Sequence, residues 1–319
     1  MESDWKPNLF IPGFPKCGTS ALCEYLAQHK DIYVIPIKEP NTLATSLPLS
    51  KLSRTQLQGK DRIWTVLPYE EYERLYKENA RKKYRVDASQ PFSAIDLSVN
   101  VARYIREFSP NAKIVLMIRE QKNRLISYYL FSKGLGLHDY DFSTWLNRIT
   151  PHINDFLFYE KTSRFYDEFG SNLLVLQQKA LMENPQQVMD RICDFLGVER
   201  IAVKYVTSNE SLYINSRIAN KILSRFEYAS HVFAKRLEHM QYGSRLIYSV
   251  LSPLHRRWRS LLSAVSNPED KQQVYRELLE KMPSSLKTVL EEDYNRTVLY
   301  CKERGILLEV LNTKSKDTN

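Results

Sequence analysis

Short apolar runs alternate with stretches of helical periodicity through the first two thirds of the chain. Strands are predicted at 8–14, 32–37, 84–87, 113–118 and 173–176. The clearest is 113–118, because a continuous apolar run bounded by polar residues suits a sheet that is covered on both faces. Helical spacing predicts helices near 19–29, 69–83, 94–107, 121–132 and 185–196. This order predicts an α/β fold with a central, mostly parallel sheet flanked by helices.

The strand signal disappears after about residue 206. From there the sequence predicts helices, with Pro253 and Pro268 as breaks. We therefore expect a core over residues 1–205 and a helical C-terminal portion over 206–319 that packs on it, within one structural domain overall.

Composition adds a bias toward anionic partners. The chain of 319 residues carries a formal net charge of +9, which favours nucleotides, acidic glycans, nucleic acid or anionic membranes. Between 221 and 260, eight Lys or Arg residues stand against two Glu, with aromatic residues interleaved. This segment could make a peripheral membrane contact or bind an acidic glycan or a partner. It could equally form helical core with a solvated charged face.

The four cysteines are scattered and match no zinc spacing, so we expect a reducing compartment and no metal. The N-terminus lacks the basic and apolar pattern of a signal peptide, and no run of 18 apolar residues occurs. These features predict a cytoplasmic protein that no membrane-spanning segment anchors.

A candidate anion-binding loop follows the first predicted strand. Pro15-Lys16-Cys17-Gly18-Thr19-Ser20 combines a cation, a glycine turn and two hydroxyls directly before a helix. It differs from the loop of nucleotide triphosphatases, G-x-x-x-x-G-K-[ST], because the lysine precedes the glycine. The alternative is a solvated turn lysine followed by Thr19 as an ordinary N-cap.

A second candidate anion site lies at the end of the 113–118 strand. Arg119 follows that strand directly, and Ser127 stands eight residues later in the predicted helix. An arginine can hold a phosphate through two hydrogen bonds, and the serine can donate to another oxygen of the same group. Arg119 alone could instead make a structural ion pair.

Together these motifs resemble the sulfotransferases that use 3′-phosphoadenosine 5′-phosphosulfate (PAPS), whose fold is a three-layer, P-loop-like α/β structure. The resemblance implies that Lys16, Gly18, Thr19 and Ser20 bind the 5′-phosphosulfate, with Cys17 as a spacer in the loop. It implies that Arg119 and Ser127 bind the 3′-phosphate. Lys16 would also neutralise the leaving oxygen, so its loss should cost on the order of a hundredfold in rate.

Three further stretches, 37–40, 87–92 and 174–198, look like the same family, nearest to its glycan-modifying and bacterial branches. The chain also departs from the family pattern. Gln121 stands where a proline is common, and Phe92 stands where a tyrosine is frequent. No late cofactor loop is recognised, so the C-terminal third has no assigned role.

Sulfuryl transfer to a hydroxyl or amine needs a general base. The resemblance places Glu39 near the donor sulfate as that base, with Lys38 as a substrate contact. The pair could also be a solvated loop dipeptide. His29 competes as a base but is expected to cap a helix end. Asp87 is a weaker candidate substrate contact, since aspartate is also a frequent turn former.

The sequence thus predicts an enzyme that moves a sulfuryl group in line from PAPS to a hydroxyl or amine, most plausibly of a glycan; a lipid or small metabolite stays open. We expect no nucleic-acid partner, and the sequence says nothing of the oligomeric state. Two rival readings remain: a P-loop nucleotide phosphotransferase, and a non-enzymatic basic protein that binds membranes or nucleic acid.

Overall fold

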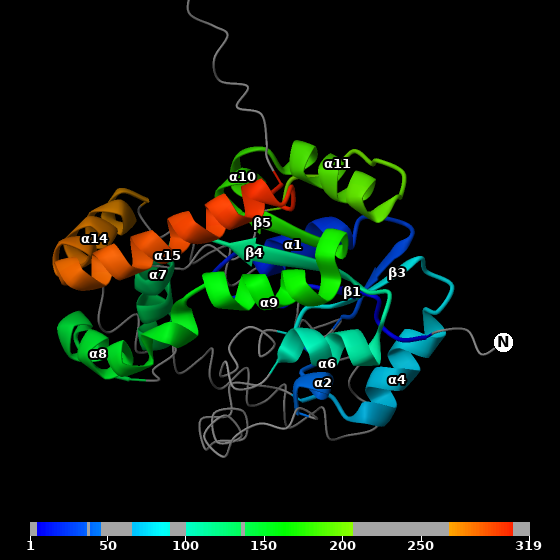
Figure 1. Cartoon of the computed structure of the whole chain (residues 1–319), viewed down its shortest axis with the longest axis horizontal. Coiled ribbons are helices and arrows are strands. Elements are labelled where there is room, and N and C mark those ends of the chain that lie inside the picture. Colours follow the sequence, from blue (N-terminus) through cyan, green and yellow to red (C-terminus); the bar gives the residue numbers. More distant parts are fainter. Residues whose placement is uncertain are drawn as a thin grey trace, which may run out of the picture. The chain divides into compact units, whose positions relative to one another are not determined.

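A single parallel sheet organises the molecule. The computed structural model describes residues 5–36, 39–45, 66–89, 100–134, 138–206 and 268–308. The strands are β1 (Leu9–Phe10), β2 (Ile32–Val34), β3 (Tyr84–Asp87), β4 (Lys113–Ile118) and β5 (Leu173–Gln177). They lie in the order β2-β3-β1-β4-β5, and every pairing between them is parallel (Figure 1). The predicted α/β fold with a central parallel sheet is confirmed.

The first strand is shorter than the apolar run 8–14 predicts. Ile11 still donates its amide to the carbonyl of Asp87 at 2.9 Å. The next residue, Pro12, has no N–H group and cannot continue the ladder. Residues 11–14 therefore stay buried but leave the sheet as a loop.

The described helices are short to medium in length. They are α1 (Thr19–Leu26), α2 (Thr42–Thr45), α4 (Tyr69–Glu78), α6 (Val101–Phe108), α7 (Gln121–Gly134), α8 (Phe142–Ile149), α9 (Tyr159–Phe169), α10 (Gln178–Glu183), α11 (Pro185–Leu196), α14 (Pro268–Glu280) and α15 (Ser284–Glu303). The predicted helix 185–196 matches α11, and Gly197 ends it in the left-handed conformation at φ 63°. No helix in the described ranges is both long and apolar enough to cross a bilayer.

The strand order creates a switch point beside β1. The chain leaves β1 through α1 toward β2, on one side, and later crosses from β3 through α6 to β4, on the other. Right-handed crossovers in opposite directions place their helices on opposite faces of the sheet. Figure 1 agrees, with α6 and α9 in front of the sheet and α1 behind it. The crevice for a ligand in such a sheet lies at the carboxyl ends of β1 and β4.

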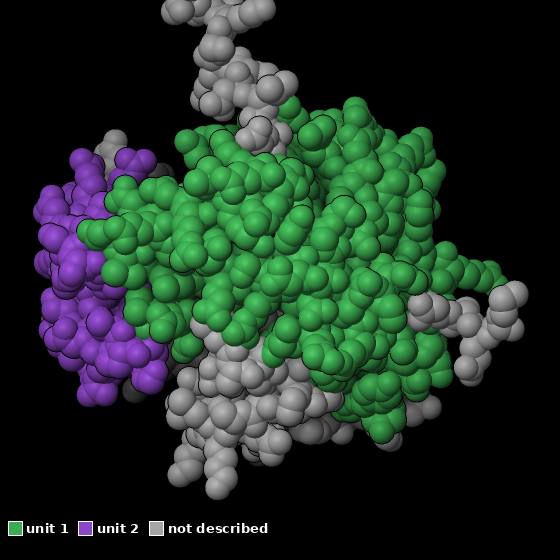
Figure 2. All heavy atoms as spheres, viewed as in Figure 1, with its two compact units in different colours: residues 1–121, 153–208, 288–319 green, residues 122–152, 209–287 purple. Residues whose placement is uncertain are grey.

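The chain divides into two compact units (Figure 2). The first contains residues 1–121, 153–208 and 288–319 and holds the whole sheet, and the second contains 122–152 and 209–287. The boundary near residue 205 stays a prediction for the domain organisation. The basic segment 221–260 lies outside the described residues.

The C-terminal segment also adds to the sheet, which the sequence does not predict. Val175 of β5 donates its amide to Ile306 and accepts from the amide of Leu308, both at 2.8 Å. Ile306 and Leu308 are buried in the core. Their apolar run is too short to be recognised as a strand without knowledge of its partner.

Candidate active site

The loop after β1 is a tight turn built on left-handed residues. Lys16 has φ 65° and Gly18 has φ 93°. Helix α1 begins at Thr19, with Gly18 as its N-cap residue. The first N–H groups of a helix have no partner within the helix, so they point toward any anion held in the loop. The predicted loop therefore has the local geometry of an anion site.

A side chain would clash at Gly13 and would be crowded at Gly18, two glycines of this loop. A Cβ on Gly13 would lie 2.3 Å from Cγ2 of Thr19, and a Cβ on Gly18 would lie 3.1 Å from Cγ of Gln178. The backbone is thus in close contact with its surroundings on both sides of Lys16. This close packing favours one loop conformation over others.

The side chains of the loop divide into a buried group and an accessible group. Cys17 is fully buried, and its amide donates to the carbonyl of Phe14 at 3.3 Å. That placement agrees with a spacer role for its thiol. Lys16, Thr19 and Ser20 are half-buried, so part of each remains open to solvent.

Arg119 joins the second predicted site to the first. It follows β4 at the carboxyl edge of the sheet, and its Nη1 donates to the carbonyl of Lys16 at 3.2 Å. A guanidinium carries five N–H donors, so this bond is compatible with binding an anion as well. Two motifs that stand about a hundred residues apart in sequence therefore meet at one place.

The turn after Arg119 is tied to the C-terminal helix α15. Gln121 is buried and donates its side-chain amide to Asp293 Oδ2. The same carboxylate accepts from the backbone N–H groups of Phe158, at 2.7 Å, and Tyr159, at 3.2 Å. Asp293 thereby supplies the cap that no side chain of α9 provides for its own N-terminus. The glutamine that replaces the common proline has a specific partner in this chain.

Tyr294, the next residue of α15, lies nearer the loop at residues 15–20. Its hydroxyl accepts from Nε2 of Gln177, at the end of β5, at 3.2 Å. Burial, with smaller contributions from Glu120 and Cys17, raises the pKa of Tyr294. Neither Asp293 nor Tyr294 can be predicted from a local motif, because their partners lie more than a hundred residues away.

Ser127 lies in α7 and is buried. It belongs to the second unit, whereas Arg119 belongs to the first. That Ser127 and Arg119 both bind the same 3′-phosphate stays a prediction.

The carboxylate candidates occupy different environments. Glu39 is half-buried, directly before the buried Pro40, and Lys38 lies outside the described residues. Asp87 is fully buried at the end of β3. Its Oδ1 accepts from the backbone and hydroxyl of Ser89, at 2.9 Å and 2.6 Å, and its Oδ2 accepts from the Tyr72 hydroxyl at 2.8 Å. Burial raises the pKa of Asp87, although these hydrogen bonds oppose the shift.

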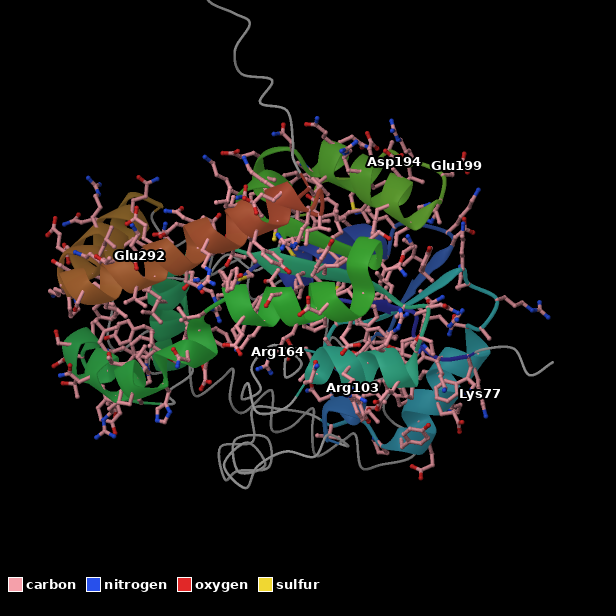
Figure 3. The ribbon with its side chains drawn as sticks, in the orientation of Figure 1. Lys77, Arg103, Arg164, Asp194, Glu199 and Glu292 are labelled. Atoms are coloured by element: carbon pink, nitrogen blue, oxygen red, sulfur yellow. The ribbon has the colours of Figure 1, made fainter. Side chains whose placement is uncertain are left out.

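His29 is placed as a structural residue. It is buried beyond the end of α1, and its Nδ1 accepts from the amide of Asp31 at 3.0 Å. Its Nε2 therefore carries the proton and donates to the carbonyl of Glu199 at 2.8 Å. Figure 3 shows Glu199 at the periphery, beyond α11. Because α1 starts at the carboxyl edge of the sheet and runs back, His29 lies at the amino edge, away from the loop.

Within the described ranges, no three His, Cys, Asp or Glu side chains gather as a metal site would require.

The fold and this loop define an α/β protein with a candidate anion-binding loop at the switch point of its sheet. A family model described as the sulfotransferase domain matches residues 6–211, about two thirds of the chain. The chain belongs to the sulfotransferase domain family.

A solved structure agrees with the fold. A sulfotransferase from Alicyclobacillus acidocaldarius is 23% identical, with a TM-score of 0.53, over 75% of this chain and 96% of that chain. A sulfotransferase domain from the Synechococcus PCC 7002 olefin synthase is 17% identical, with a TM-score of 0.40, over 70% of this chain and 94% of that chain. The comparison with curated proteins found no match.

Proposed function

We propose that this sulfotransferase takes its sulfuryl group from PAPS and transfers it to a hydroxyl or amine of a glycan. The observation that carries the donor assignment is the hydrogen bond from Arg119 to the carbonyl of Lys16. It brings the loop proposed for the phosphosulfate next to the residue proposed for the 3′-phosphate. A donor with two anionic ends fits two adjacent anion sites.

The shape of the loop supports this assignment. A glycine at position 18 and the half-buried Thr19 and Ser20 allow a phosphate-sized group to approach the start of α1 closely. PAPS, when bound, supplies a sulfuryl group joined to phosphate through a bridging oxygen. Lys16 is the cation placed to stabilise the charge that grows on that oxygen as the bond breaks.

We assign Glu39 as the general base that removes the proton from the acceptor. A carboxylate next to the donor site can accept the proton of the attacking hydroxyl or amine while the new bond to sulfur forms. Both oxygens of Asp87 already accept hydrogen bonds from the protein, and both ring nitrogens of His29 are engaged. Asp87 and His29 therefore have structural partners in the fold, and the resemblance to the family favours Glu39 as the base beside the donor sulfate.

The acceptor assignment rests on the family resemblance and on charge. The resemblance to glycan-modifying enzymes favours a glycan, and the net charge of +9 favours an acidic one. A lipid or small metabolite with a hydroxyl group would satisfy the same chemistry.

Calorimetric titration tests the donor proposal directly. The product nucleotide, 3′-phosphoadenosine 5′-phosphate (PAP), should bind the full chain at least tenfold more tightly than ATP with magnesium. Preferential binding of ATP with magnesium would instead favour a nucleotide phosphotransferase and would refute the proposed donor.

A further inference from the structure

The backbone that follows Glu39 is held by hydrogen bonds from two distant segments. The amide of Asn41 donates to Oγ of Ser89 at 3.0 Å. The carbonyl of Pro40 accepts from the amide of Leu67 at 2.8 Å, and the hydroxyl of Thr42 donates to the carbonyl of Leu67 at 2.7 Å. All these groups belong to buried residues. Three consecutive residues are therefore fixed immediately beside Glu39.

The carboxylate of Asp87 determines how Ser89 makes its contact. The Ser89 hydroxyl donates its only proton to Asp87 Oδ1 at 2.6 Å. Its oxygen then presents a lone pair to the amide of Asn41. Asp87 itself is held on its other oxygen by the hydroxyl of Tyr72. The result is a directed chain of hydrogen bonds from Asn41 through Ser89 to Asp87.

The held segment is also strained. Asn41 is 1% exposed and has φ 55°, in the left-handed region that residues other than glycine seldom occupy. Such conformations persist where the surrounding contacts over-determine them, and they cluster at functional sites.

We propose that Ser89 and Asp87 are positioning residues that set the location of Glu39 for proton transfer. This inference rests on the proposed function, because it assigns a purpose to the placement of the base. It replaces the expectation that Asp87 contacts substrate. Asp87 acts through Ser89 on the backbone at residues 40–42, and a small displacement of that backbone moves the carboxylate away from the acceptor proton.

Two matched variants separate positioning from mere stability. Ser89→Ala removes the link to Asn41, whereas Tyr72→Phe removes a buried hydroxyl from the same carboxylate but leaves that link in place. Ser89→Thr keeps the hydroxyl. Urea unfolding measures the stability of each variant, so that the losses in Ser89→Ala and Tyr72→Phe can be compared.

The first measurement is hydrogen exchange of the full chain without ligand, followed by mass spectrometry of the segment 39–45. We expect exchange at Asn41 to rise about tenfold or more in Ser89→Ala and to stay near the unmodified rate in Tyr72→Phe. The second measurement is the single-turnover release of PAP from PAPS with water as acceptor. Water attacks sulfur, the bond from sulfur to the bridging oxygen breaks, and the base takes the proton.

We expect Ser89→Ala to lower PAP release about tenfold toward the level of Glu39→Gln, with unchanged affinity for PAP, while Ser89→Thr restores it. Unchanged exchange and release in Ser89→Ala, or equal losses in Tyr72→Phe, would overturn the inference. Failure of the unmodified chain to bind PAP would instead refute the proposed function, and the exchange measurement would still report on the segment.

Discussion

The two halves of the candidate site are built in different ways. The donor loop at residues 13–20 is recognised from its own sequence: a glycine at each close contact and a helix that starts directly behind it. The segment at Glu39 takes its shape from elsewhere, through Ser89 and Leu67. A contiguous motif therefore predicts the proposed donor site, whereas distant residues hold the segment that carries the proposed base.

The largest expected effect is the loss of transfer activity in Glu39→Gln, a change that should leave donor binding intact. Glu39→Gln keeps the size of the side chain but removes its basicity. Transfer from PAPS should fall about a hundredfold or more, while the affinity for PAP stays within about twofold. Calorimetry and PAP release measure the two quantities. An active Glu39→Gln variant would remove Glu39 from the mechanism.

The next effect concerns the support of the donor half from the C-terminal helix. Asp293→Ala leaves Gln121 and the first amides of α9 without their acceptor. The free energy of unfolding should fall by about 2–3 kcal/mol, because hydrogen bonds to a charged group and a helix cap are lost together. Urea unfolding measures this change. Glu292→Ala, on the neighbouring exposed residue, is the control and should change stability little.

A smaller effect tests the close packing of the donor loop. Gly13→Ala would place a methyl group against Cγ2 of Thr19, at a cost of about 1–3 kcal/mol in stability. Thr19→Ser removes that methyl group and keeps the hydroxyl. The double variant should therefore recover most of the loss in a double-mutant cycle, again by urea unfolding. Simple additivity would show that the contact does not limit the loop.

The smallest effect is a pH dependence from Asp87. Burial raises its pKa in the folded chain above the ordinary value of about 3.9. The folded state then binds more protons than the unfolded state between those two pKa values. Asp87 therefore makes stability decline as pH rises from about 4 toward its folded pKa. In Asp87→Asn this decline should be absent when stability is measured across that range.

Much of the fold could be predicted from local patterns. The predicted strands 84–87 and 113–118 coincide with β3 and β4. The second is a continuous apolar run from Ile114 to Ile118 that is bounded by Lys113 and Arg119, and the first alternates apolar and polar residues. The donor loop and Arg119 can also be predicted from local sequence, because each motif consists of residues close together in the chain that directly follow a predicted strand.

The remaining parts depend on contacts between distant residues. Asp293 and Tyr294 have no motif around them, and their roles follow only from where α15 packs. Asp87 was predicted as a possible substrate contact from its place at a strand end. Its burial and its partners, Tyr72 and Ser89, could not be read from the sequence, because hydrogen-bond partners depend on how the loops fold back.

The most direct test of the account asks whether Arg119 recognises the 3′-phosphate. Binding of PAP and of adenosine 5′-phosphate, which lacks that group, would be titrated against the unmodified chain and Arg119→Ala. We predict that the substitution weakens PAP binding about tenfold to a hundredfold and leaves adenosine 5′-phosphate binding unchanged. Equal weakening of both nucleotides would contradict the account, because Arg119 would then support only the shape of the loop through Lys16.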